Sequence, residues 1–277
     1  MRSLRRTLKA CIALFMIRVA ERIQYRAAAL ANSSTTIFWG ILHVVLLTVF
    51  FTFGREQVAA ISLTQAITYM WLAQILLGLI AMPYSGIDDE FRKKITDGDV
   101  AVELCRPLDL YAFWYAKTAA NKLGGNFWRV IFTALAALLA PAAFRLSLPD
   151  SAAGFALFLL SVISAFVLSA AFAMMLTAIR MGLTWGDGPI SSLALVGMLL
   201  SGSYFPLPLW PDFMQRILLL QPFAGILDIP LRLYIGSILP ADAFWAIGLQ
   251  VIWAAAFILL GKILMNRQLA RLIVQGG

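Results

Sequence analysis

The densest group of charged side chains lies in the stretch DDEFRKKITDGDVAVELCRPLD, residues 88–109, which carries eleven charges in twenty-two residues. Converging carboxylates can bind a divalent metal ion and activate water. One interpretation is therefore a metal-dependent enzyme that modifies lipid headgroups. Against it, the leading carboxylates are adjacent rather than spaced along one helical face, and no second acidic motif pairs with them. The carboxylates in question are those of Asp88, Asp89, Glu90, Asp97, Asp99 and Glu103.

Other residue types that carry enzyme chemistry are sparse. His43 is the single histidine, which excludes an HExxH motif or a two-histidine metal site. Ser203 follows Gly202 without the GxSxG spacing of a nucleophile elbow, and no GxxxxGK[ST] phosphate-binding loop occurs. We therefore predict no catalytic, cofactor-binding or metal-ligating residue. A pump built on this chain must draw its energy from a partner.

The composition is that of an integral membrane protein. Of the 277 residues, 61% are hydrophobic and only 13% are charged, whereas a soluble domain has about a quarter charged. Continuous apolar runs of about 20 residues can cross a bilayer as helices. We expect an all-α fold with six transmembrane helices, at residues 33–53, 61–82, 127–144, 151–179, 189–205 and 243–265.

The distribution of Lys and Arg predicts the orientation. With the N-terminus inside, 18 of the 22 basic residues lie on the cytoplasmic side and 4 lie outside. Both termini and the charged stretch are then cytoplasmic. The net charge of +8 is attributed to this bias and to contact with membrane lipids, not to nucleic-acid binding.

Residues 1–30 predict an amphipathic helix in the plane of the membrane interface, not a cleaved signal peptide. The apolar run CIALFMI is too short for a signal core, and Arg18, Glu21 and Arg22 interrupt the segment after it. Apolar residues recur at helical spacing while arginines follow another face. The apolar positions are Leu4, Leu8, Ile12, Phe15, Val19 and Ile23.

Mildly polar side chains occur inside the first two predicted spans. They could line a path for an amphipathic molecule, or they could hydrogen-bond between helices as packing residues. The candidate path residues are Thr35, Thr36, His43, Thr64, Gln65, Thr68 and Gln74. In the fourth span a ridge of small residues predicts close helix packing only; it comprises Ser161, Ala165, Ser169, Ala173 and Thr177.

The connection from Pro83 to about Asn126 is the longest cytoplasmic loop. Residues 87–95 predict a short helix with acidic residues in its first turn and lysines near its end, an arrangement that suits the helix dipole. Asp97-Gly98 ends it, residues 100–104 form a further turn, and residues 108–123 approach the third span. A docking helix for a soluble cytoplasmic partner is favoured; a merely solvated loop and the metal site are the alternatives.

Prolines interrupt the region after the fifth span. Pro206, Pro208 and Pro211 are expected to stop that helix, and Phe213 to Leu220 is too short to cross. Pro222 and Pro230 are expected to break the next pieces, so this segment predicts short helices that re-enter the outer leaflet.

Two stretches carry a resemblance to a known family. The loop has the form I-x-x-G-x-x-x-x-x-L-x-R-P-L, from Ile95 to Leu108, and the segment SGSYFPLPLWPDFMQRILLLQPFAGILDIPLRLYIG spans residues 201–236. Together they resemble type-2 ATP-binding-cassette (ABC) transporter permeases, nearest the branch of daunorubicin and viologen exporters.

The resemblance implies a single permease domain over residues 1–277, in a bacterial cytoplasmic (inner) membrane. It comprises an interfacial helix (1–30), a cytoplasmic coupling loop (83–126) and an outer re-entrant segment (201–240). Its partners would be a cytoplasmic ABC ATPase, which binds ATP and Mg²⁺, and a second identical or homologous permease. The cargo would be an amphipathic small molecule or a lipid-like molecule; lipid or polysaccharide-linked export by the same machinery, a lipid-modifying enzyme and a non-transporting scaffold are the alternatives.

The resemblance also assigns roles to residues. ATPase docking would involve Asp88, Asp89, Glu90, Phe91, Arg92, Lys93, Lys94, Ile95, Gly98, Arg106 and Pro107. The first, second and fifth spans would line the path. An outer lid would be formed by Ser201, Gly202, Phe205, Pro206, Pro208 and Pro211.

Overall fold

The computed structural model describes residues 2–24, 26–53, 61–80, 89–97, 99–105, 108–149, 151–182 and 188–270. Over these residues the fold is entirely helical and contains no strand. The predicted all-α class is therefore confirmed for the described part of the chain.

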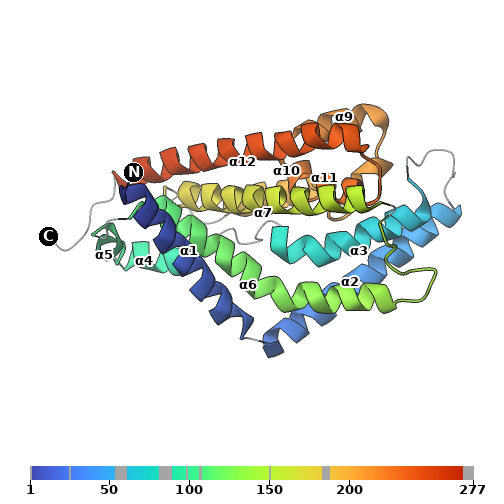
Figure 1. Ribbon diagram of the computed structural model, residues 1–277, viewed down its shortest axis with the longest axis horizontal. Helices are drawn as coiled ribbons and strands as arrows, with labels where there is room; N and C mark the ends of the chain where they lie inside the picture. The colour runs from blue at the N-terminus through green and yellow to red at the C-terminus, as the bar shows by residue number, and fades with distance from the viewer. Residues whose placement is uncertain are drawn as a thin grey trace.

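Two long helices, α7 (Ala152–Arg180) and α12 (Pro240–Leu269), lie side by side along the long axis of the molecule (Figure 1). Their close approach follows from the small-residue ridge of α7, all five members of which are buried, as the packing prediction requires. Gln250 of α12 is fully buried and accepts a 3.0 Å hydrogen bond from Ser161. Its amide nitrogen also donates to the Gly225 carbonyl at 2.7 Å, so one side chain joins three segments.

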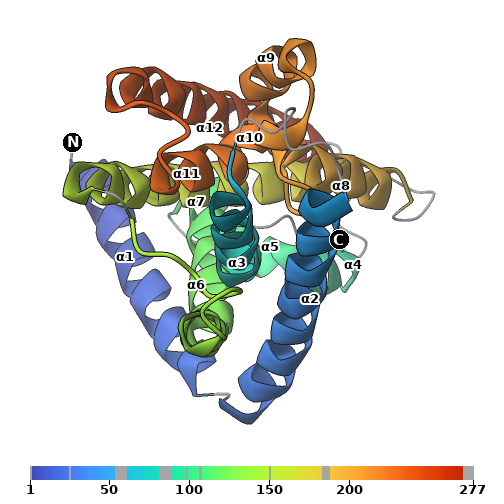
Figure 2. The same cartoon turned by 90° about the vertical axis from the view of Figure 1, so that its right-hand side faces the viewer.

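The second layer is built around α6 (Leu110–Leu139). Helix α1 (Arg2–Ile23) crosses α6, and α2 (Arg26–Phe53) and α3 (Leu63–Ile80) pack on it further along. Seen end-on, α1 and α2 form a V whose two arms meet at its base, with α6 and α3 between them (Figure 2).

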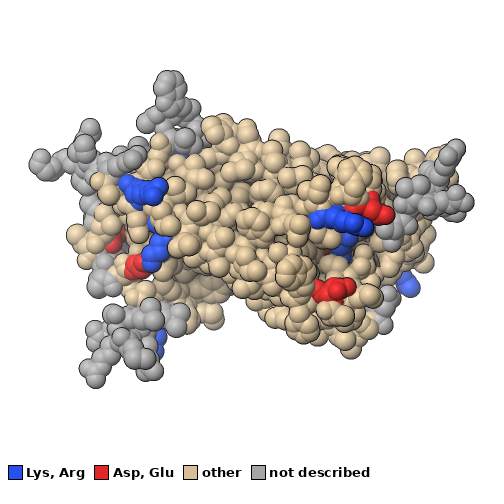
Figure 3. All heavy atoms as spheres, turned by 90° about the horizontal axis from the view of Figure 1, so that it is seen from above, with Lys and Arg blue, Asp and Glu red and all other residues tan. Residues whose placement is uncertain are grey.

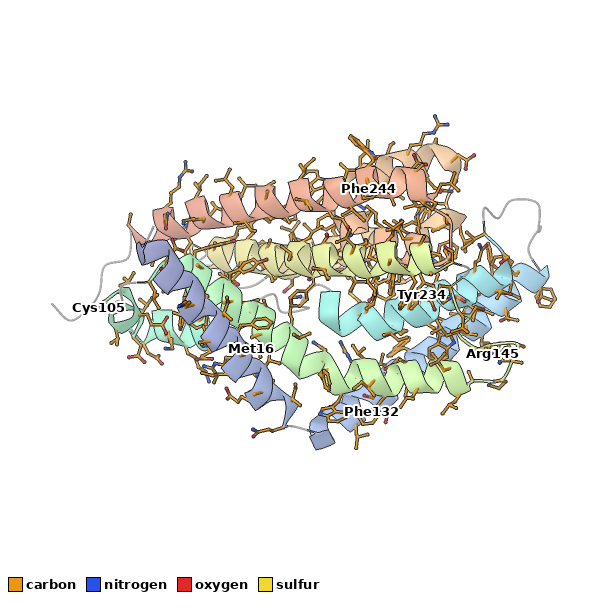
Figure 4. All side chains as sticks on the ribbon, in the orientation of Figure 1. Met16, Cys105, Phe132, Arg145, Tyr234 and Phe244 are labelled. Atoms are coloured by element: carbon orange, nitrogen blue, oxygen red, sulfur yellow. The ribbon has the colours of Figure 1, made fainter. Side chains whose placement is uncertain are left out.

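The short helices lie at the two ends of the bundle. Helices α4 (Asp89–Thr96) and α5 (Val100–Leu104) lie at the same end as the N-terminus (Figure 1). The 3-10 helix η2 (Leu207–Leu209), α9 (Asp212–Leu220), α10 (Pro222–Ile226) and α11 (Asp228–Tyr234) come after α8 (Gly188–Leu200). Figure 4 places Cys105 beside α5 and Arg145 at the opposite end of the molecule.

Three helices of the described chain are long and apolar enough to cross a membrane, over Ala29–Phe53, Ala152–Arg180 and Pro240–Leu269. On the face in Figure 3, Lys, Arg, Asp and Glu form two groups separated by a broad uncharged band. On α12 the acidic first turn holds Asp242 and the last turn holds Arg267. These residues are 25 positions apart, or about 37 Å of helix, which exceeds a hydrocarbon core of about 30 Å. The chain is a membrane protein by these criteria.

The other three predicted spans also fall on helices, namely α3, α6 and α8, but with shifted bounds. The predicted approach at 108–123 and the third span form one helix that starts at Leu110, where Asp109 accepts a 2.8 Å hydrogen bond from the Ala112 N–H. This helix ends at Leu139 rather than at 144. Ala140 precedes Pro141 and adopts an extended backbone, since proline disfavours the helical conformation of the residue before it.

Two expectations about the proline-rich region were wrong in detail. Helix α8 ends at Leu200, before the prolines, and Gly202 lies just beyond it with a backbone φ of +84°, a conformation that glycine adopts readily. Pro230 does not break a helix but lies in the first turn of α11, where its missing N–H has no intrahelical acceptor to lose.

Candidate functional site

Helix α4 is attached to α6 through an aromatic pair. Phe91 is 1% exposed, and its ring centroid lies 4.4 Å from that of Trp114. Tyr111, Met174 and Met265 complete a small hydrophobic cluster around this pair, with contributions from α6, α7 and α12. A force on α4 would therefore act directly on three of the long helices.

A charged network reinforces this attachment. Glu90 of α4 forms an ion pair with Lys117 of α6 and another, at 3.5 Å, with Arg18 of α1. The Lys117 ammonium is buried and lies 4.1 Å from the centroid of the Trp114 ring. Partial burial alone would raise the pKa of the Glu90 carboxyl, but Lys117, Arg18 and Lys94 outweigh it and hold that pKa below its ordinary value.

Helix α5 joins the same network through Glu103. This carboxylate is 4% exposed and accepts a 2.7 Å hydrogen bond from the Trp114 indole N–H, and it also pairs with Lys94 of α4. Trp114 thus contacts Phe91 with its ring, at an interplanar angle of 54°, and Glu103 with its indole nitrogen. One residue of α6 holds both short helices.

Asp109 connects the start of α6 to the end of α12. Besides capping α6, its carboxylate forms a 2.7 Å ion pair with Lys262. Partial burial opposes ionisation, yet Lys262 and the backbone N–H groups of Ala112 and Tyr111 lower the pKa of this carboxyl overall.

The carboxylates considered for a metal site do not converge where they are described. Glu90 and Glu103 are paired with lysines, and Asp97 and Asp99 are exposed. Asp88 lies outside the described residues. Across the described chain, no group of three or more His, Cys, Asp or Glu side chains could hold a metal ion.

The predicted docking residues divide by the direction they face. Glu90 and Phe91 point inward to α6, whereas Lys93 is exposed and Lys94 is half-buried. Asp89, Arg92 and Ile95 lie on α4. Gly98, Arg106 and Pro107 lie outside the described residues, as does Asp88. The exposed part of α4 is what remains available to a partner, and the inward part anchors it.

The path residues of the first predicted span bond within their own helix. The Thr36 hydroxyl donates to the Asn32 carbonyl at 2.9 Å, and Thr35 donates to Ala31 at 3.5 Å. His43 Nδ1 lies 2.7 Å from the Trp39 carbonyl oxygen. Such bonds to the preceding turn satisfy a polar group inside an apolar helix. Thr35 is nevertheless exposed on the surface of α2.

Three path residues of α3 line a common cavity. Thr64, Gln65 and Thr68 border a space of about 310 Å³ together with Ser62, Ser147 and Tyr234. The Gln65 amide donates to the Ile235 carbonyl at 2.9 Å, and Thr68 accepts from the Ser147 N–H at 3.2 Å. The cavity therefore has a neutral, hydrogen-bonding wall. Gln74, further along α3, is buried and is not among the residues that line it.

The predicted outer lid packs against a buried polar group that sequence reasoning missed. A Cβ on Gly202 would lie 2.2 Å from the Tyr69 hydroxyl oxygen, so glycine is required for this approach. Tyr69 donates to Asp228 at 2.7 Å, and Arg232 pairs with the same carboxylate at 2.6 Å. Of the other lid residues, Ser201, Pro206 and Pro208 are buried, Phe205 is half-buried and Pro211 is exposed.

The Asp228–Arg232 pair could have been found from its spacing. An acid and a base four positions apart in an apolar stretch lie on one face of a helix. Arg232 is one of the four basic residues predicted to lie on the outer side, and the charge distribution alone gives it no other role. A single charge count does not reveal that both side chains are buried, with Asp228 fully enclosed.

Comparison with known protein families gives a match over most of the chain. The family described as "ABC-2 family transporter protein" matches residues 30–276, which is nearly the whole chain. Comparisons with curated proteins and with solved structures found no match.

Proposed function

Because this chain belongs to the ABC-2 family of transporters, we propose that it is the membrane-spanning permease subunit of an ATP-driven exporter whose ATPase is a separate chain. The observation that carries the proposal is the attachment of α4 to α6. Phe91, Glu90 and Glu103 fix two short helices at one end of the bundle, leaving Lys93 exposed toward a partner.

The proposed topology has six spans, formed by α2, α3, α6, α7, α8 and α12, with both termini cytoplasmic. The excess of basic residues on that side supports the orientation. Helix α1 lies in the cytoplasmic interface, and α9, α10 and α11 re-enter the outer leaflet. Each of these three helices has at most nine residues, too few to cross.

In the proposed mechanism, ATP and Mg²⁺ bind the ATPase, whose closure moves α4. Glu90 pairs with Lys117 of α6, and the cluster around Phe91 includes residues of α7 and α12, so these contacts would transmit a movement of α4 to all three helices. The bundle would then alternate between two arrangements, each favoured by a different nucleotide state.

A second permease copy would face the apolar surfaces of α2 and α8. Both helices expose large hydrophobic side chains, including Phe38, Trp39 and Val49 on α2 and Leu195 and Leu199 on α8. Such a surface faces either lipid or another protein in a membrane. The family's usual arrangement places the path between two subunits, with α2, α3 and α8 lining it.

The cargo is proposed to be an amphipathic small molecule or a lipid-like molecule. The candidate path side chains are neutral, so a hydrogen-bonding and partly apolar cargo suits them better than an ion. Lipid or polysaccharide-linked export by the same machinery is the alternative within transport.

The decisive experiment is mild-detergent purification of the tagged chain from its native host, with native mass and ATPase activity measured together. We expect two permease chains with two ATPase chains. Lys93→Glu on the exposed part of α4 should release the ATPase, whereas Lys9→Glu, an equal charge reversal on exposed α1, should not. Repeated recovery of a lone oligomer would instead favour the scaffold. Headgroup chemistry without nucleotide, lost on chelation or in Asp89→Asn, would favour the enzyme.

A further inference from the structure

One face of α6 carries three polar side chains that the proposed function does not use. Lys122, Asn126 and Arg129 are spaced four and then three residues apart, so they lie one above another. The sequence analysis counted the two cations only as part of the cytoplasmic excess. Helix α6 itself, Leu110–Leu139, contains no acidic residue.

These side chains meet the last turn of α3. The Asn126 amide donates to the Gly78 carbonyl at 2.7 Å, and a Cβ on Gly78 would lie 1.0 Å from Arg129 Nη2. The guanidinium therefore occupies the space that glycine leaves open. Lys122, one helical turn before Asn126, donates a 2.9 Å hydrogen bond to Ser169 of α7. Two positive charges are thus held where α3, α6 and α7 meet.

Nearby protein groups leave part of the Arg129 guanidinium without a hydrogen-bond acceptor. Its Nε is buried and has no hydrogen-bond partner among the described residues. The C-terminus of a helix such as α3 supplies the equivalent of about half a negative charge, which offsets only part of the Arg129 charge. A buried donor without an acceptor is unfavourable, so a negative charge beside the accessible part of this guanidinium is favoured. Both cationic side chains remain partly exposed, which leaves a route for one.

Contacts with α1 indicate how deep Lys122, Asn126 and Arg129 lie in the membrane. The Arg22 guanidinium donates to Asn121 at 3.2 Å, and the Trp128 indole donates to the Ile23 carbonyl at 2.9 Å. Val19 of α1 packs against Gly124. The end of α1 therefore lies level with residues 121–128 of α6. An interfacial α1 places Lys122, Asn126 and Arg129 near the headgroups of the cytoplasmic leaflet.

We propose that Lys122 and Arg129 form a binding site for the phosphate group of an anionic phospholipid from the cytoplasmic leaflet, with Asn126 as a positioning residue that holds the end of α3 against α6. The guanidinium fork matches phosphate oxygens and the ammonium adds a second charge. The Asn126 amide donates to the Gly78 and Lys122 carbonyls, and so fixes the last turn of α3 beside the two cations. The inference rests on the membrane orientation in the proposed function, but not on nucleotide-driven transport.

The test is native mass spectrometry of the purified chain after incubation with phosphatidylglycerol or, in parallel, phosphatidylcholine. We expect phosphatidylglycerol to be retained preferentially, and the double variant Lys122→Gln/Arg129→Gln to retain it about tenfold less, as expected when charge-assisted hydrogen bonds are lost. The control Lys9→Gln/Arg267→Gln removes two exposed cations at the cytoplasmic end and should retain the lipid as the wild type does.

Two further experiments separate loss of lipid binding from loss of folding and from binding of free phosphate. Lys122→Arg/Arg129→Lys preserves both charges and should retain the lipid, which separates a loss of binding from a loss of folding; size-exclusion profiles check the latter. In the second experiment, inorganic phosphate is titrated in a thermal-shift assay. Equal retention in the double-Gln variant, equal loss in the control, or stabilisation by free phosphate without lipid preference would each overturn the assignment. Because no ATPase is present, failure here leaves the permease proposal standing.

Discussion

The Tyr69 hydroxyl donates a 2.7 Å hydrogen bond to Asp228, joining α3 to α11 across 159 residues of sequence. The same carboxylate pairs with Arg232, whose Nη1 donates to Gln215 of α9 at 3.2 Å. Tyr69 and Gln215 occupy part of the hydrogen-bonding capacity of this buried pair, while Arg232 Nη2 has no partner among the described residues. This group joins the short helices α9 and α11 to α3.

Removing the Tyr69 hydroxyl should loosen the outer helices. Tyr69→Phe deletes a donor to a fully buried carboxylate, and we expect a loss of about 1.5–3 kcal/mol in unfolding free energy. Thermal unfolding in detergent measures it. Tyr115→Phe is the matched control, because that hydroxyl donates to a neutral carbonyl, Val167, and should cost about 1 kcal/mol. Equal losses in the two variants would count against the charged group.

Gly202→Ala should disturb the same place from the lid side. Its backbone φ of +84° costs an L-residue roughly 1–2 kcal/mol, and the new methyl group would collide with the Tyr69 hydroxyl. We expect a lower unfolding temperature and faster proteolysis within residues 201–236. Gly248→Ala is the control, since a Cβ there meets nothing within 4 Å. Equal stability of the two variants would contradict the close approach.

Trp114→Phe should weaken the coupling of α4 and α5 to the bundle. Phenylalanine keeps a ring against Phe91 but removes the donor to buried Glu103, at a cost of about 1–3 kcal/mol. In the reconstituted transporter we expect ATP-driven export to fall while basal ATP hydrolysis continues. Trp245→Phe, at an exposed position of α12, should change neither.

A double-mutant cycle separates this contact from a general loss of packing. If Trp114 and Glu103 act together, Trp114→Phe in a Glu103→Gln background should have less effect than in the wild type. If the effects of the two substitutions on export simply added, the Trp114 indole would act through a contact other than Glu103.

The elements were more predictable than the contacts between them. The apolar runs placed α2, α7 and α12, and the charge order around residues 88–96 predicted α4, because both signals are local. The inward direction of Phe91 and Glu90 was not predictable, since it depends on Trp114 and Lys117, more than twenty residues away. The buried Asp228–Arg232 pair and the pairing of Arg129 with the end of α3 also depend on tertiary packing. The end of α8 at Leu200 lies just before Gly202, whose positive φ no periodicity in the sequence indicates.

The attachment of α4 should also depend on pH, through Glu90. Its folded-state pKa is held below the ordinary carboxyl value, so the charged form stabilises the fold. This stability is fully present above the unfolded pKa of about 4, and is lost as the pH falls through the lowered folded-state value. Below that value, buried Lys117 loses the charge of its partner Glu90. An environment-sensitive dye on exposed Cys105, in a Cys11→Ala background, reports the release of α4 and α5 from α6.

The variants define which carboxylate is responsible. In Glu90→Gln, residue 90 carries no charge at any pH. At pH 7 the dye signal of this variant should therefore already differ from that of the wild type, and it should change much less as the pH is lowered. Asp97→Asn removes an exposed carboxylate from the same loop and should leave the transition in place. If instead Asp97→Asn abolished the transition and Glu90→Gln preserved it, the ion pair with Lys117 would not be what fixes α4. The exposed charges of the loop, screened by solvent and salt, would then have to account for its position.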